Sequence, residues 1–138
     1  SGEFSQKKTS NNKPLHYLGN KFHRVEKGFV CQAGDITRGD GSGGESIWNK
    51  KFNDEKEGLK IKFDKPGILS MANSGKNSNT SQFFITFAAN TKLDGKYVAF
   101  GSIVGEESLN VLKKIEQVEA KDGKPSVDVT IVGCGILK

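Results

Sequence analysis

The chain has 138 residues, of which 34% are apolar and 27% are charged. This length suits one domain with a single hydrophobic core, so residues 1–138 are expected to form one domain. The net charge of +5 comes from scattered lysines, whereas nucleic-acid binders carry a basic stripe with interleaved aromatic side chains. No apolar run approaches the ~20 residues of a membrane-spanning helix. We therefore expect neither a nucleic-acid nor a membrane partner.

Cysteine and histidine usage argues against redox and metal chemistry. Cys31 and Cys134 are far apart, and neither belongs to a C-x-x-C pair. Cys31 lies in an apolar pattern typical of a buried strand, which favours a reducing compartment and a cytoplasmic protein. His16 and His23 have no accompanying carboxylate or cysteine cluster, so we expect no metal ion or other cofactor.

The first half of the chain predicts a polar loop followed by two strands. Residues 1–13 are polar and predict an exposed loop. Residues 22–25 alternate in the manner of a strand, Gly28 interrupts the pattern, and residues 29–33 predict a second, more buried strand. The glycine-rich residues 36–52 predict an irregular surface loop.

The second half predicts further short strands and one helix. Strand patterns cover residues 59–63, 68–73, 81–87, 97–104 and 127–136. Residues 106–118 predict the helix, because Leu109, Leu112, Ile115 and Val118 recur every three residues. Short strands, glycine turns and one helix in the C-terminal half indicate a mainly β fold, an antiparallel barrel that is closed or nearly closed.

The residues around Arg24 suggest a site that uses shape and one positive charge. Arg24 can stand on one face of its strand while Phe29 and Gln32 approach from the next strand. No acid/base pair, thiol–imidazole pair or metal cluster accompanies them. Taken singly, Phe29 would be a core residue and Arg24 a surface ion-pair partner more often than not, so only their joint spacing favours a functional reading.

Four stretches of the sequence resemble, in order and spacing, the cyclophilin family of peptidyl-prolyl cis-trans isomerases. They are FHRVEKGFVCQAGDITRGDGSGGESIW, GILSMANSGKNSNTSQFFIT, LDGKYVAFGSIV and VTIVGCG, and the match runs from about residue 13 to the C-terminus. The resemblance implies an eight-stranded antiparallel barrel closed by helices, with the active site on its outer surface. It also implies an enzyme that accelerates rotation about Xaa-Pro peptide bonds and needs no cofactor.

The N-terminal residues resemble the longer insertion of divergent-loop cyclophilins, so residues 1–13 are expected to be this exposed divergent loop. The family places two strands and a helix before this point, and the sequence does not contain them. A barrel without two strands exposes unpaired edges. We therefore expect either an open sheet or a compensating partner. Of the redox cysteine pair that divergent-loop members can carry, only Cys134 has a match, so no redox switch is expected.

The resemblance also implies the site residues. Arg24 matches the catalytic arginine, which would weaken the resonance that gives the prolyl bond its barrier of roughly 18–20 kcal/mol. The matches to the proline pocket are Phe29, Val30, Phe84 and Leu93. The matches to the groove for the preceding residue are Gln32, Ala72, Asn73 and Gln82, with Gly41 and Ser74 near the adjoining pocket.

Three positions depart from the family pattern. Val30 replaces a methionine, Lys92 stands where the best-known members carry a tryptophan that helps bind cyclosporin, and Tyr97 replaces a histidine at the pocket rim. We expect isomerase activity to survive and the affinity for cyclosporin-type cyclic peptides to be reduced.

Three functions remain open at this point. The leading one is a prolyl isomerase that acts on proline-containing peptides and proteins and assists their folding, as a chaperone does. The alternative is a proline-peptide binding module without turnover. A nucleic-acid-associated domain is the third, and it rests on charge alone.

Overall fold

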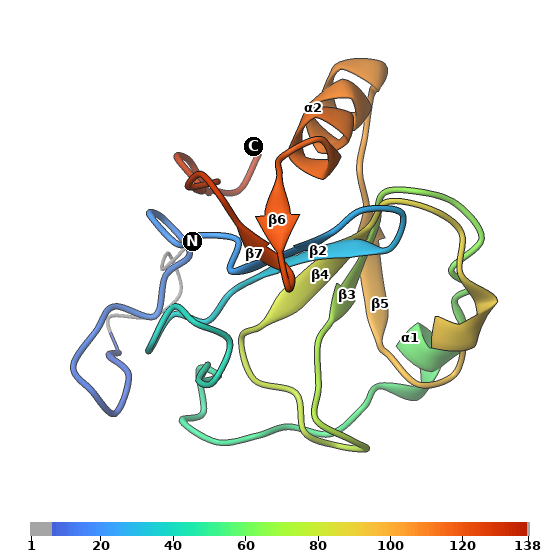
Figure 1. The fold of residues 1–138 in the computed structure, drawn as a ribbon. Coiled ribbons are helices and arrows are strands. Elements are labelled where there is room, and N and C mark those ends of the chain that lie inside the picture. The colour runs from blue at the N-terminus through green and yellow to red at the C-terminus, as the bar shows by residue number, and fades with distance from the viewer. Residues whose placement is uncertain (1–6, 138) are drawn as a thin grey trace.

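The centre of the molecule is an open, twisted antiparallel sheet (Figure 1). The computed structural model describes residues 7–137. The five strands of the sheet follow the order β1-β2-β4-β3-β5. They are β1 (Arg24–Glu26), β2 (Val30–Ala33), β3 (Ile68–Met71), β4 (Phe83–Thr86) and β5 (Ala99–Ser102). A separate hairpin joins β6 (Ala120–Lys121) to β7 (Lys124–Pro125), and the helical elements are α1 (Lys56–Lys60), the 3-10 turn η1 (Thr91–Leu93) and α2 (Glu106–Glu116).

The mainly β, antiparallel fold class is confirmed. Within residues 7–137 the sheet is open, which is one of the two outcomes expected of a barrel without two strands and differs from the closed or nearly closed barrel that the short strands indicate. Strands β1 and β5 end the sheet, and within residues 7–137 no strand pairs with the outer edge of β5. Phe100 and Val104 stand exposed at that edge. Backbone donors and acceptors along such an edge have no neighbouring strand to pair with.

The strand expected over residues 127–136 is largely absent, and this prediction was wrong. Within residues 7–137, the segment forms an isolated antiparallel bridge between Lys21 and Thr130 and no regular strand. Backbone bonds from Phe22 to Val129, and between residues 19–20 and Ile131, tie the segment to the chain on one side. The segment has no second strand within the described residues, and three such contacts do not make a regular ladder.

The strand expected over residues 59–63 was also wrong, because α1 occupies the first part of that segment. Gly58 of α1 lies so close to strand β5 that an added Cβ would be 2.5 Å from Val98 and 3.0 Å from the Ala99 carbonyl oxygen. A glycine lets this turn of helix pack directly on the sheet edge. The chain becomes extended only after α1, and Phe63 is fully buried.

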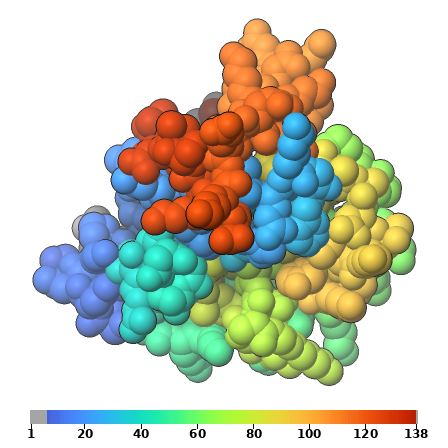
Figure 2. Space-filling view, viewed as in Figure 1, coloured from blue at the N-terminus to red at the C-terminus, as the bar shows by residue number. Residues whose placement is uncertain are grey.

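The predicted helix is confirmed as α2, which ends two residues earlier than expected, at Glu116. Leu112 is buried, Leu109 and Ile115 pack beside it, and Val111 on the other side is exposed. Glu106 and Glu107 in the first turn and Lys113 and Lys114 in the last turn suit the helix dipole. The helix projects from the body of the molecule (Figure 2). No helix within residues 7–137 is long and apolar enough to cross a bilayer.

The two faces of the sheet carry two separate apolar clusters. The first contains Val30, Phe63, Ile68, Ala72, Phe84, Leu93 and Ala99. The second contains Phe22, Val25, Cys31, Ala33, Phe87 and Leu112, with partly buried side chains from α2 and from residues 129–131 against it. Burial of a large apolar side chain is worth roughly 1.5–3 kcal/mol, so both faces contribute to stability. Cys31 is fully buried, as the sequence predicts.

Residues 7–13 form a mostly exposed loop, but the loop is fastened to the body. Thr9 is buried, and the Ser10 backbone N–H and hydroxyl both donate to the Glu45 carboxylate. Lys13 donates from its ammonium to the Thr37 carbonyl oxygen at 2.7 Å. The part of the divergent-loop prediction that concerns residues 1–6 lies outside the described residues.

Gly34 follows the last residue of β2 and has a backbone conformation that only glycine tolerates well. We therefore predict that Gly34→Ala lowers the free energy of unfolding substantially. The φ of Gly34 is +92°, and an added Cβ would lie 2.3 Å from the Ser81 carbonyl oxygen. The backbone conformation alone costs roughly 1–3 kcal/mol, and the clash adds overpacking strain. Urea unfolding should therefore show a markedly lower midpoint for Gly34→Ala.

Gly28→Ala is the matched control for that experiment. Gly28 also has a positive φ, of +76°, but an added Cβ meets nothing within 4 Å. It should lose only the conformational part of the stability. Equal midpoints for the two variants, at equal denaturant slopes, would show that the close approach at Gly34 has no energetic consequence.

Candidate active site

The register of four strands lines up the polar and aromatic side chains of the predicted site. Arg24 of β1 lies opposite Gln32 of β2, Gln32 lies opposite Phe84 of β4, and Phe84 lies opposite Ser70 of β3. Directly opposite residues share one face of a sheet. Val30 lies two residues from Gln32 and belongs to the same face. Arg24, Gln32, Val30 and Phe84 are therefore held on one surface by backbone hydrogen bonds.

The residues matched to the proline pocket gather in the first apolar cluster. Val30, Phe84 and Leu93 are buried members of it, and Phe29 and Tyr97 pack against it while partly exposed. The Phe84 ring is stacked on Phe63 at 5.9 Å and meets Tyr97 edge-on at 5.3 Å. These contacts fix the orientation of the buried Phe84 ring, and Phe29 and Tyr97 are the partly exposed side chains of the cluster.

The guanidinium group of Arg24 lies over the ring of Phe29, one of the partly exposed side chains of this cluster. Its Cζ atom lies 5.8 Å from the centroid of the Phe29 ring, within the range of a cation–π contact. Its NH2 nitrogen is 2.7 Å from Oε1 of Glu26, and its side chain is 40% exposed. The aliphatic part of the Arg24 side chain packs near Gly123 in the β6–β7 turn, because a Cβ added to Gly123 would be 3.3 Å from Cγ of Arg24. Arg24 is thus oriented on three sides and open to solvent on the fourth.

Gln32, Gln82 and Gly41 are joined by side-chain hydrogen bonds. The Gln32 amide donates from Nε2 to Oε1 of Gln82 at 2.8 Å. The Gln82 amide donates from Nε2 to the carbonyl oxygens of Gly41 and Gly43, each at 2.8 Å. Two predicted groove residues and the glycine loop therefore form one connected unit beside Arg24.

The remaining groove residues line a polar pocket next to this unit. The pocket has a volume of about 220 Å³. Its walls include Gln32, Gly41, Lys51, Ala72, Asn73, Ser74 and Gln82. Asn73 is held from both sides, because its amide donates to the Lys96 carbonyl oxygen and its side-chain oxygen accepts from Gly75.

Lys92 lies on η1, one residue before the buried Leu93. The Asn90 side chain accepts from the Lys92 backbone N–H and caps this turn. The neighbouring Phe63 N–H donates to Asp94 and the Asn90 N–H donates to the Phe63 carbonyl oxygen, which pins the turn to the core. Lys92 is exposed while Leu93 faces the cluster.

Three side chains near the site were not proposed as site residues from the sequence, although His23 was considered there as a metal ligand and rejected. Glu26 is two residues from Arg24 on the same strand, so alternation alone could have identified it as a partner. The ring of His23 lies against Gly41, where an added Cβ would be 2.7 Å from Nε2. Lys51 comes from a distant loop, and no local pattern places it at the polar pocket.

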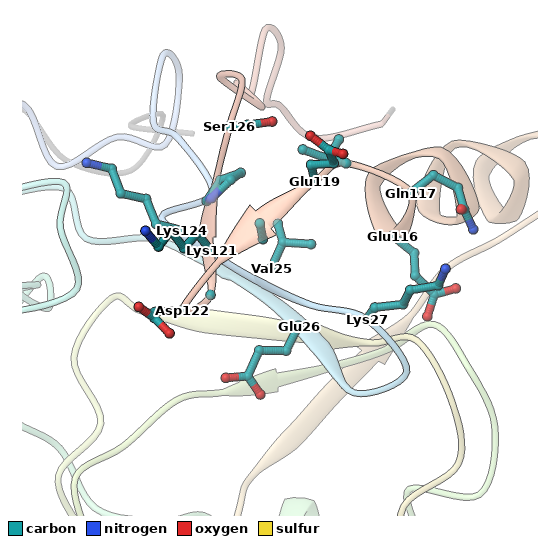
Figure 3. A pocket seen from close by; sticks show the side chains of 14 residues that line it. Val25, Glu26, Lys27, Glu116, Gln117, Glu119, Lys121, Asp122, Lys124 and Ser126 are labelled. Carbon is teal, nitrogen blue, oxygen red and sulfur yellow. The ribbon is translucent and has the colours of Figure 1, made fainter.

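A larger, more open depression lies beside the site rather than in it (Figure 3). It has a volume of about 1140 Å³, and Val25, Glu26 and Lys27 of the β1 region face residues 116–126 across it. Apart from Glu26 and Gly123, which contact Arg24, the residues that bind or orient groups at the site do not line it. Both acidic and basic side chains line its walls (Figure 3), so it offers no single ligand chemistry. Among residues 7–137, no group of three or more His, Cys, Asp or Glu side chains could hold a metal ion.

His23 predicts a loss of stability on mild acidification. Burial lowers its pKa from the usual 6.5, Arg24 acts in the same direction, and Asp35 and Asp40 oppose it. The unfolded chain therefore binds more protons below pH 6.5, and the free energy of unfolding falls as the pH falls, by at most about 1.4 kcal/mol per pH unit. Urea unfolding at pH 7.5 and 5.5 should show this fall, and His23→Gln should reduce it. His16→Gln, at the other histidine, is the control, and equal reductions in both variants would contradict the assignment.

Comparison with known protein families agrees with this geometry. The model of the family described as cyclophilin type peptidyl-prolyl cis-trans isomerase/CLD matches residues 3–136. The match covers nearly the whole chain, including every strand of the sheet and all the residues of the candidate site. Together with the mainly antiparallel β fold, it shows that the chain belongs to the cyclophilin-type peptidyl-prolyl cis-trans isomerase family, a family of enzymes that act on proline-containing peptides.

Proposed function

We propose that the surface formed by Arg24, Gln32 and the first apolar cluster is the isomerase active site. The observation that carries this proposal is the position of the Arg24 guanidinium, 5.8 Å from the centre of the Phe29 ring and opposite Gln32 in register. A proline ring would lie on the apolar surface made by Phe29, Val30, Phe84 and Leu93, with Tyr97 at its rim. The backbone before the proline would lie along Gln32, Ala72, Asn73 and Gln82, with Gly41 and Ser74 beyond.

In this arrangement rotation needs no covalent step. The guanidinium would donate to the prolyl nitrogen as that nitrogen becomes pyramidal, which favours the twisted state over the planar one. A charge-assisted hydrogen bond is worth roughly 1.5–3 kcal/mol. This is a fraction of the barrier of roughly 18–20 kcal/mol, so the fit of the apolar surface and the exclusion of water would supply more.

A non-catalytic proline-peptide binding module is the second candidate. The observation that favours it is the ion pair between Arg24 and Glu26 at 2.7 Å, which partly neutralises the cation that catalysis would use. Exposed ion pairs are worth only about 0–1 kcal/mol. The pair is therefore weak enough for a bound peptide to draw the guanidinium away, and we favour the enzyme.

The physiological role that follows is assistance to protein folding in a reducing compartment, which we take to be the cytoplasm. Uncatalysed Xaa-Pro isomerisation takes tens to hundreds of seconds and limits the folding of many chains. The described cysteines, Cys31 and Cys134, are both free, which supports a reducing environment.

Arg24→Ala tests the catalytic proposal. Loss of one charge-assisted hydrogen bond in the twisted state should lower kcat/KM for an Xaa-Pro peptide by about 10- to 150-fold. Affinity for the peptide should change much less, because the apolar surface remains. A protease-coupled or NMR exchange assay measures the first quantity and calorimetry the second.

Arg38→Ala is the matched control, since Arg38 is the chain's other arginine and is exposed on the loop after β2. It should keep kcat/KM within about twofold of the original. Binding by the unaltered protein and by Arg24→Ala, with no turnover by either, would favour the binding module instead.

We also propose that cyclosporin-type cyclic peptides bind with reduced affinity, because Lys92 offers an ammonium where an indole would offer an apolar ring and one N–H donor. Lys92→Trp should strengthen inhibition roughly tenfold, the value of one hydrogen bond with some added apolar contact. Lys114→Trp on α2 is the control and should leave inhibition unchanged. Tight inhibition of the unaltered protein would refute the proposal.

A further inference from the structure

The loop after β2 is built around the carboxylate of Asp35. This side chain is 1% exposed and accepts six hydrogen bonds. Oδ1 accepts from the backbone N–H groups of Thr37 and Arg38 and from the Thr37 hydroxyl, and Oδ2 accepts from the N–H groups of Asp40, Gly41 and Gly43. Burial acts to raise the pKa of Asp35, but these donors outweigh it and hold the pKa well below the usual range. The carboxylate is therefore charged throughout the neutral pH range.

Two glycines let the loop close around this carboxylate. An added Cβ at Gly43 would be 2.1 Å from the Thr37 hydroxyl oxygen and 2.6 Å from Oδ1 of Asp35. Gly41 has a φ of +93°, in the region that glycine tolerates best. The Thr37 hydroxyl also accepts from the Gly44 N–H. These contacts fix the loop conformation, including the directions of the carbonyl groups at 41 and 43.

Those two carbonyl groups decide which way the Gln82 amide points. Both accept from Gln82 Nε2 at 2.8 Å, so each amide N–H of Gln82 has a partner. A flipped amide would set its oxygen against two carbonyl oxygens and leave acceptors without donors. Oε1 of Gln82 must therefore face the other way, toward Gln32.

The Gln82 side chain in turn orients the Gln32 amide through a hydrogen bond. Gln32 donates one N–H to Oε1 of Gln82 at 2.8 Å, and within residues 7–137 its side chain makes no other hydrogen bond. Its remaining N–H and its side-chain oxygen are left for a bound peptide, next to Arg24 in register. If the Gln82 amide were free to rotate, the Gln32 amide could turn either its NH2 group or its oxygen toward Gln82, and the groups that it offers to a peptide would no longer be fixed.

We propose that Asp35 is a positioning residue for isomerisation, because it fixes the carbonyl groups of Gly41 and Gly43 that orient Gln82 and, through Gln82, Gln32. The inference rests on the proposed function of Gln32 and Gln82 in holding the peptide backbone. Asp35 touches neither the peptide nor the prolyl bond. It acts through backbone and amide groups.

Asp35→Asn tests the inference in the full chain. In either orientation the asparagine amide nitrogen would face backbone N–H groups, those of Thr37 and Arg38 or those of Asp40, Gly41 and Gly43. Because N–H groups cannot accept from one another, the loop should rearrange. We expect kcat/KM for an Xaa-Pro peptide to fall about tenfold, with most of the change in KM. In ¹H–¹⁵N spectra, the side-chain amide resonances of Gln82, assigned with Gln82→Ala, should move toward those of solvent-exposed glutamines.

A double-mutant cycle separates positioning from a merely structural effect. Gln82→Ala should lower kcat/KM about tenfold in the original chain but less than about twofold when Asp35→Asn is already present. Equal tenfold losses in both backgrounds, or unmoved Gln82 resonances in folded Asp35→Asn, would overturn the inference. No loss from Gln82→Ala in either background would instead mean that the proposed site is wrong.

Glu45→Gln is the control for loss of a loop carboxylate. Glu45 is also buried and accepts from Ser10 and Asn49, but these contacts do not lead to Gln82. Its kcat/KM and Gln82 resonances should stay unchanged even if stability falls.

Thr37→Val is the second test, should Asp35→Asn fail to fold. It removes only the hydroxyl group that links Asp35 to Gly44. Its Gln82 resonances should move in the same direction and its kcat/KM should fall by a smaller factor. Unchanged resonances and unchanged kcat/KM in Thr37→Val would likewise overturn the inference.

Discussion

The antiparallel register across β1, β2, β4 and β3 is the constraint on which the site depends. It sets Arg24, Gln32 and Phe84 in one row on one face of the sheet. A slip of one residue in any pairing would turn every side chain of that strand to the opposite face, and Arg24 would then point into the second apolar cluster. Burial of the alternate residues, Val25 and Cys31, beneath α2 prevents this slip. The hydrophobic core on one face thus holds the polar row on the other.

The same sheet shows why local patterns are not enough to form a strand. Residues 127–136 have good strand alternation, with Val129 and Ile131 packed on the second cluster, yet with the rest of residues 7–137 they form a single bridge. A strand needs a partner along its length, and residues 129–131 are hydrogen-bonded to the short segment 19–22. Residues 83–86 have a similar pattern but lie between β2 and β3, and they form a complete strand. Pairing, rather than propensity, separates the two segments.

The sequence predicted the elements whose signals are local and the neighbours whose spacing is fixed by a strand. Helix α2 follows from the recurrence of Leu109, Leu112 and Ile115, and the Arg24–Gln32 neighbourhood follows from two adjacent strands joined by Gly28. The sequence did not predict α1, because the packing of Gly58 on Val98 and Ala99 is a contact between segments 40 residues apart. Nor did it reveal Lys51 at the polar pocket or the hydrogen bonds of Asp35, since a carboxylate that accepts from the backbone N–H groups of its own loop leaves no periodic pattern.

An enzyme that twists a bond without forming a new one has few chemical means, so the placement of its groups carries most of the effect. Flexible side chains such as arginine and glutamine are poorly suited to this unless their rotamers are fixed by neighbours. Here Glu26 and the Phe29 ring restrain Arg24, and Phe63 and Tyr97 restrain Phe84. The buried charge of Asp35 is costly in isolation, but six donors offset that cost. A charge maintained in this way, outside the reach of the peptide, is best understood as a source of rigidity for the groups that the peptide meets.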